Sequence, residues 1–172
     1  MSENINKYIF IDGSVNPQLK LGFGSYLILN NLNTTVHKDM IQTKMFNDTS
    51  SSKLEIQTLL YALNEITPKN YNITIFTDCQ NILTLQDRRS TLENNNYLTK
   101  TNKIVKNHLE YKDFYRLFNM YNLKFVKLKG HKKKSAKDTI DNIFSLVDKS
   151  ARNSLRNFIN SQTVPNTNKK QI

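Results

Sequence analysis

The chain has 172 residues, of which 38% are hydrophobic and 23% are charged. This length and composition are typical of one folded domain and exclude a disordered chain. The single cysteine, Cys79, excludes an intramolecular disulfide and a zinc site built from cysteines, so we expect an intracellular protein. No apolar run is long enough to cross a bilayer and the first residues are too polar for a signal peptide, so we expect a cytoplasmic protein with no membrane partner.

The charge is strongly positive. Lysine and arginine number 25 against 14 aspartates and glutamates, which gives a formal net charge of +11. This excess predicts a polyanionic partner such as a nucleic acid. The lysines concentrate in one stretch, and its members are Lys124, Lys127, Lys129, Lys132, Lys133, Lys134 and Lys137. The alternative is a solvated basic surface that only keeps the protein soluble.

The first third of the chain predicts an antiparallel meander followed by a helix. An apolar run over residues 7–12 predicts a buried strand, and the alternating segments 22–30 and 34–46 predict its antiparallel partners. Residues 50–66 then change to helical spacing, with Ser51 or Ser52 as the N-cap. The apolar positions of this helix are Leu59, Leu60, Leu63 and Ile66.

The rest of the chain predicts two more strands and two more helices. Residues 72–78 form a second buried strand, 94–121 a helix, 123–130 a strand and 137–159 a long amphipathic helix. The apolar side of the last helix consists of Ile140, Ile143, Phe144, Val147, Ala151, Leu155 and Phe158. The order of elements predicts an α/β fold with a mixed sheet flanked by helices.

We expect one catalytic domain over residues 1–160, followed by a polar tail over residues 161–172. No internal repeat divides the chain. We also expect a monomer.

Two aspartates follow the buried strands. Asp12 ends the first strand and Asp78 ends the strand at 72–78, and parallel pairing through the intervening helix would bring both carboxylates to one sheet edge. Taken alone, Asp12 is also the residue type of a strand-to-turn exit, because it precedes Gly13. Glu55 lies near the start of the helix, where it is either a third acid or a capping-box partner of Ser52.

Three crowded carboxylates must either take up protons or bind cations. Carboxylate oxygens are ligands for Mg²⁺ or Mn²⁺ and not for zinc. Two such ions activate a water and stabilise the leaving oxygen of a displacement at phosphorus. A basic protein with this site is predicted to be a nuclease.

The motifs carry a resemblance to a known family. The segments YIFIDGS…GFGSYLI, SSSKLEIQTLLYAL, ITIFTDCQNIL and LKGHKKK…VDKSAR resemble type 1 ribonuclease H over residues 7–156. The resemblance implies a ribonuclease H-like fold with a five-stranded mixed sheet, and an endonuclease that cuts the RNA strand of RNA/DNA hybrids to leave 5′-phosphates. It places the catalytic acids at Asp12, Glu55 and Asp78. It also implies that His131 assists proton transfer or product release; the alternative is an incidental loop residue beside lysines.

The fourth acid has two candidates. The segment VDKSAR copies the local pattern of the family and favours Asp148, whereas the spacing from the histidine favours Asp141. The two lie two helical turns apart, on one face. We favour Asp148 because an insertion in the lysine-rich loop changes spacing without changing a local pattern. The resemblance then implies two Mg²⁺ ions, or Mn²⁺, held by Asp12, Glu55, Asp78 and Asp148.

The expected partner is an RNA/DNA hybrid, bound through its backbone. Ser51 and Ser52 stand where the family often has two asparagines that contact the minor groove, so we expect altered hybrid discrimination. Lysine and arginine supply contacts to phosphates that do not depend on base sequence. The predicted nucleic-acid-binding residues are Ser14, Ser51, Ser52, Arg88, Arg89, Lys132, Lys133 and Lys134.

Two other functions remain open at this point. The same fold serves DNA junction resolvases and transposase-like nucleases, which also use clustered acids. A catalytically impaired module that only binds hybrids is the second alternative, because the two asparagines are replaced.

Overall fold

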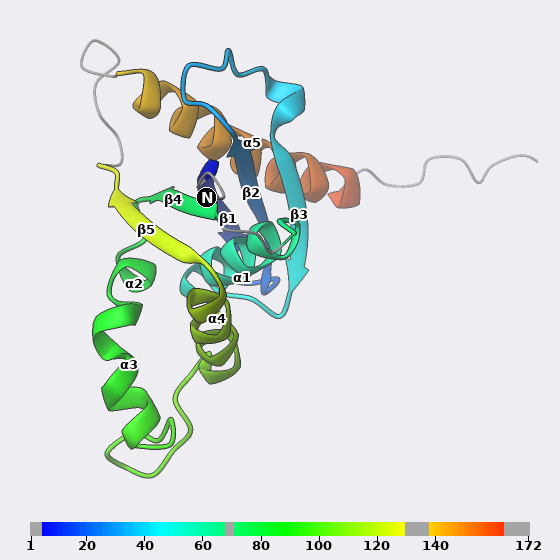
Figure 1. The fold of residues 1–172 in the computed structure, drawn as a ribbon. Helices are drawn as coiled ribbons and strands as arrows, with labels where there is room; N and C mark the ends of the chain where they lie inside the picture. Colours follow the sequence, from blue (N-terminus) through cyan, green and yellow to red (C-terminus); the bar gives the residue numbers. More distant parts are fainter. Residues whose placement is uncertain (1–4, 68–70, 130–137, 164–172) are drawn as a thin grey trace, which may run out of the picture.

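The computed structural model describes residues 5–67, 71–129 and 138–163. Its five-stranded sheet has the order β3-β2-β1-β4-β5 (Figure 1). The strands are β1 (Ile5–Asn16), β2 (Leu21–Leu29), β3 (Gln42–Asn47), β4 (Tyr71–Thr77) and β5 (Asn122–Lys127). Strands β1, β2 and β3 pair antiparallel, whereas β4 and β5 run parallel to β1. The predicted mixed sheet is confirmed.

Helices cover both faces of this sheet. They are α1 (Ser51–Asn64), α2 (Gln80–Leu83), α3 (Leu85–Asn94), α4 (His108–Met120) and α5 (Thr139–Thr163). Helices α1 and α4 pack on one face and α5 packs on the other (Figure 1). Helix α3 and the loop after it project from the body of the molecule (Figure 1). None of the helices in the described ranges is both long and apolar enough to cross a bilayer.

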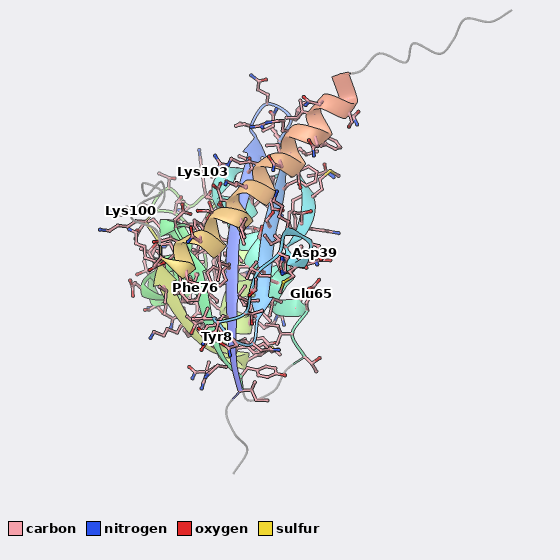
Figure 2. All side chains as sticks on the ribbon, turned by 90° about the horizontal axis from the view of Figure 1, so that it is seen from above. Tyr8, Asp39, Glu65, Phe76, Lys100 and Lys103 are labelled. Atoms are coloured by element: carbon pink, nitrogen blue, oxygen red, sulfur yellow. The ribbon has the colours of Figure 1, made fainter. Side chains whose placement is uncertain are left out.

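The alternation of side chains along β1 divides the core into two layers. Ile9 and Ile11 point toward α1 and α4, where they join a cluster with Leu63 and Phe114. Phe10 points to the opposite face and packs beneath α5. Figure 2 shows α5 lying across the strands, with the labelled Phe76 and Tyr8 on the sheet; both residues belong to the layer that α5 covers.

Two predicted elements are corrected by the structure. The strand predicted over residues 34–46 is wrong in its first half, because β3 begins only at Gln42 and is preceded by a 3₁₀ turn, Lys38–Met40. The side chains of residues 33–35 and 37–39 are exposed, and only Val36 and Met40 between 33 and 40 pack against the core, so the segment lacks the every-second-residue burial of a strand.

The helix predicted over residues 94–121 begins only at His108, and α2 and α3 before it were missed. Four residues between the helices have left-handed backbone angles, which a right-handed helix cannot contain. They are Asn96, Tyr97, Asn102 and Asn107. Helix α3 gives little sequence signal because Leu85 is its one fully buried residue.

Candidate active site

The register of two parallel strands brings Asp12 and Asp78 together. Phe10 of β1 pairs with Phe76 of β4, and their rings stack with centroids 4.5 Å apart. Asp12 and Asp78 each lie two residues beyond this pair, so both carboxylates reach the same edge of the sheet. The predicted parallel pairing is confirmed. The turn interpretation of Asp12 is wrong, because β1 does not end there and continues to Asn16.

Glu55 reaches the same edge from the other face. The backbone of β1 lies close to side chains of α1 at Gly13. A Cβ atom added to Gly13 would lie 2.8 Å from Leu54 Cδ2 and 3.6 Å from Glu55 Cγ. Glycine at this position therefore allows Glu55 to lie beside Asp12. The capping-box interpretation of Glu55 is wrong, because α1 begins at Ser51 with Ser50 at the N-cap, and Glu55 lies beyond the capping positions.

One carboxylate oxygen each from Asp12, Glu55 and Asp78 lies within 4.8 Å of the other two. This spacing allows all three to contact a single divalent cation. Glu55 Oε2 is buried without a hydrogen-bond partner among the described residues. An unpaired buried carboxylate oxygen is costly unless a proton or a cation satisfies it. The cluster therefore fits a metal ion with oxygen ligands.

Burial and mutual repulsion perturb the two innermost acids. Burial raises the pKa of Asp12 to about 8, and the charges of Asp78, Asp148 and Glu55 add to the rise. The Gly13 N–H donates a hydrogen bond to Asp12 Oδ1 at 2.7 Å, and this bond lowers the pKa of Asp12 and offsets part of the rise. Burial also raises the pKa of Glu55, to about 7. A hydrogen bond from Cys79 lowers this pKa, and the charge of Asp78 raises it further. The site therefore favours protons when no cation is present.

The two candidates for the fourth acid lie in different environments. The charge of Asp148 acts on Asp12, and Asp148 also forms an ion pair with Arg152. Asp141 lies in the first turn of α5 and is buried. The N–H of Asp141 donates to Asp138 Oδ1 at 2.8 Å, and the N–H of Asp138 donates to Asp141 Oδ2 at 3.3 Å. This reciprocal pair is a capping box, which gives Asp141 a structural task.

The predicted hydroxyl contacts lie beside two cavities. Ser51 is exposed and lines a cavity of about 550 Å³ together with Lys20, Lys53 and Lys106. Ser52, the next residue of α1, is also exposed. Lys20 and Lys53 were not singled out from the sequence, because they are isolated basic residues outside any cluster. Ser14 lines a second cavity, of about 320 Å³, against α5.

Arg88 and Arg89 contact neighbouring residues of the protein. Arg88 donates to Asn81 Oδ1 at 2.7 Å and lies over the ring of Tyr111. Arg89 donates to Glu93 at 2.9 Å and to Asn119 Oδ1 at 2.8 Å. These contacts hold α3 against α4, and the nucleic-acid contact of both arginines stays a prediction. His131, Lys132, Lys133 and Lys134 lie outside the described residues.

Comparison with known proteins agrees with this architecture. The structure is similar to that of a foamy viral protease-reverse transcriptase solved in complex with dsDNA, with a TM-score of 0.63. The match covers 86% of this chain and 90% of that chain at 13% sequence identity, which shows a shared fold. No curated protein sequence gives a significant match. The family model for RNase H matches residues 4–156, and the chain therefore belongs to the RNase H family of nucleases.

Proposed function

We propose that this protein is a metal-dependent endonuclease that hydrolyses the RNA strand of RNA/DNA hybrids and leaves 5′-phosphate products. The observation that carries the proposal is the group of Asp12, Glu55 and Asp78, whose oxygens lie within 4.8 Å of one another in a chain of the RNase H family. The net charge of +11 supports a polyanionic substrate.

The proposed metal ligands are Asp12, Glu55, Asp78 and Asp148, and the proposed metal is Mg²⁺, with Mn²⁺ as the alternative. Hard carboxylate oxygens suit these ions. When bound as a pair, the ions lower the pKa of the attacking water and stabilise the departing 3′-oxygen. The unpaired Glu55 Oε2 and the raised pKa of Asp12 support this assignment, because a cation relieves both.

The residues around the acids orient them. The Gly13 N–H fixes one oxygen of Asp12, and the Cys79 thiol donates to Glu55. Burial raises the pKa of Cys79 to about 12, so the thiol keeps its proton and remains a donor. Arg152 holds Asp148 from the next turn of α5. The acids are thus positioned before any substrate binds.

Substrate recognition is proposed to depend on groove shape and backbone. The hydroxyls of Ser51 and Ser52, exposed at the start of α1, are placed to bond a 2′-hydroxyl. Lys20, Lys53 and Lys106 line the adjacent cavity, where they would meet phosphates. These contacts ignore base identity, so cleavage is expected at many sequences. His131 is proposed to assist proton transfer or product release.

The proposal is tested with a labelled RNA/DNA hybrid, incubated with and without Mg²⁺ beside duplex DNA, duplex RNA and a four-way junction. We expect Mg²⁺-dependent cleavage of the RNA strand of the hybrid alone. Asp12→Asn and Asp78→Asn should each lower turnover by about a thousandfold or more, while hybrid binding remains. Asp39→Asn is the matched control, because Asp39 is an exposed aspartate of the 3₁₀ turn.

Each alternative function gives a different result in this assay. Cleavage of the junction without cleavage of the hybrid would identify a resolvase-like nuclease. Hybrid binding with no Mg²⁺-dependent cleavage would identify a module that only binds. Full activity in Asp12→Asn or Asp78→Asn would refute the assignment of the metal ligands.

A further inference from the structure

A buried hydroxyl of β2 lies beside the acidic cluster without a hydrogen-bond partner. The side chain of Ser25 is 0% exposed, and its Oγ atom forms no hydrogen bond with any residue in 5–67, 71–129 and 138–163. An unsatisfied hydroxyl in the interior destabilises the folded state, and native proteins retain few of them. Ser25 is therefore expected to have a partner in another state of the site.

The strand register places Ser25 directly opposite Asp12. The two residues are partners in the antiparallel ladder of β1 and β2. Directly opposed residues point to the same face of a sheet, with Cβ atoms about 4.5 to 5.5 Å apart. Rotation of the Ser25 side chain about its Cα–Cβ bond can then bring Oγ within hydrogen-bond reach of a carboxylate oxygen of Asp12.

The neighbouring side chains show which face of the sheet this is. Phe10, two residues before Asp12, belongs to the layer beneath α5, and so does Leu27, two residues after Ser25. Asp12 and Ser25 therefore point toward α5 as well. Asp148 of α5 acts on Asp12 through its charge, which agrees with this placement.

The two strands beside β1 give Asp12 different neighbours. Strand β4 leads to Asp78, a second carboxylate, whereas β2 supplies Ser25, a neutral donor. The Gly13 N–H already donates to Asp12 Oδ1 at 2.7 Å. A carboxylate that binds a metal ion is oriented by hydrogen bonds from its surroundings, and these bonds contribute to metal affinity. Ser25 is placed to supply one more.

Thr43 of β3 is the other residue that the register places beside Ser25. The Thr43 side chain is exposed, so water can satisfy its hydroxyl. A hydroxyl is also a weaker acceptor than a carboxylate, because hydrogen bonds to ionised groups are the stronger ones. Asp12 is therefore the better partner for Ser25.

We propose that Ser25 is a positioning residue of the metal site: when a divalent cation binds, the Ser25 hydroxyl donates to Asp12 and fixes the carboxylate that holds the ion. The inference rests on the proposed function, because it takes Asp12 to be a metal ligand. It adds a residue outside the acidic cluster, and it gives the buried hydroxyl a task that packing does not explain.

Metal binding by Ser25→Ala tests the proposal. Mn²⁺ binding to the full chain is measured by isothermal titration calorimetry without nucleic acid. We expect Ser25→Ala to bind Mn²⁺ about tenfold or more weakly than the natural sequence, because Asp12 loses an orienting hydrogen bond. In hybrid cleavage, the variant should need a higher Mg²⁺ concentration for half-maximal rate, while the KM for the hybrid stays unchanged.

Thermal unfolding separates this role from a purely structural one. In EDTA, Ser25→Ala should have an equal or higher Tm, because it removes an unpaired buried hydroxyl. Mg²⁺ should raise the Tm of the natural sequence more than that of Ser25→Ala, because the ion binds the natural sequence more tightly. A lower Tm of Ser25→Ala in EDTA would show that the hydroxyl already stabilises the metal-free fold, and would overturn the inference.

Thr43→Val is the matched control. It removes a hydroxyl at the same level of the sheet, one strand further from Asp12, and should leave the Mn²⁺ affinity unchanged. Equal Mn²⁺ affinity of Ser25→Ala and the natural sequence would overturn the inference. The proposed function fails separately, if the natural sequence binds Mn²⁺ but does not cut the hybrid. If the natural sequence binds no Mn²⁺, both are overturned.

Discussion

Asp141 and Asp148 show how neighbouring carboxylates on one helix acquire different tasks. Asp141 exchanges hydrogen bonds with Asp138 at the start of α5. Asp148, two turns later, lies close enough to Asp12 for its charge to raise the pKa of that carboxyl. The helix repeat places both residues on the same face, and Asp148 is the one whose charge acts on Asp12.

Substitution of each aspartate separates these tasks. We expect Asp148→Asn to lower hybrid cleavage by about a hundredfold or more with little change in Tm, because a proposed metal ligand loses its charge. Asp141→Ala should retain most activity but lower the free energy of unfolding by about 1 kcal/mol, because α5 loses its capping box. Single-turnover cleavage and thermal unfolding of both variants provide the measurements. The reverse pattern would assign the fourth acid to Asp141.

At the level of elements, the distance between α1 and the sheet positions Glu55. Thr58 of α1 is buried against Gly24 of β2 and donates its hydroxyl to the Leu54 carbonyl at 2.7 Å. A methyl group on Gly24 would overlap the Thr58 hydroxyl. Glycine in β2 is therefore required for the close approach of α1, and through it for the position of Glu55.

Gly24→Ala is expected to lower the free energy of unfolding by about 1 to 3 kcal/mol, because the added methyl overfills a packed interface. It should also weaken Mn²⁺ binding, since α1 must move away from Asp12. Urea unfolding and Mn²⁺ titration measure the two effects. The double variant with Thr58→Ala should be more stable than the sum of the single changes predicts, because the overlapping hydroxyl is removed. Strict additivity would show that the two residues do not interact.

At the level of the whole molecule, the acidic cluster opposes folding when no metal is bound. The pKa of Asp12 is raised from 3.8 to about 8. A carboxyl with a raised pKa stabilises the folded state at a pH below its unfolded pKa, and this contribution is lost as the pH rises through the folded pKa. The pKa of Glu55, raised to about 7, acts in the same direction.

The metal-free protein should therefore lose stability from this site between about pH 4 and pH 8. Asp12→Asn removes the ionisation and should stabilise the metal-free protein at pH 8 by about 2 kcal/mol, or roughly 4 to 8 °C in Tm. Thermal unfolding in EDTA at several pH values gives the comparison, with Asp39→Asn as the control for net charge. Mg²⁺ should raise the Tm of the natural sequence and not that of Asp12→Asn. An identical pH dependence in the two proteins would contradict the crowding of these acids.

Several predictions stay predictions after the structure. They include the catalytic, metal-binding and nucleic-acid-binding roles of the named residues, the identity of the metal, the hybrid specificity, the domain limits, the monomeric state and the cytoplasmic location. Helix α5 extends to Thr163, beyond the predicted domain limit at 160, and residues 164–172 lie outside the described ranges.

The sequence was sufficient for the features that depend on local pattern. The apolar runs of β1 and β4, the spacing of α1 and the apolar face of α5 follow from the periods of strand and helix. Because β1 and β4 belong to one βαβ crossover, their parallel pairing also followed, and with it the proximity of Asp12 to Asp78.

Other features depended on contacts between distant residues, which no local pattern records. The tertiary fold brought Glu55 close to Asp12 and brought Asp148 near enough for its charge to act on Asp12, because each outcome depends on how closely a helix approaches the sheet. It also joined Ser14 to Arg156 across two elements that are far apart in the chain. Periodicity identifies the buried face of a helix, but packing decides which residue on that face meets the strand ends.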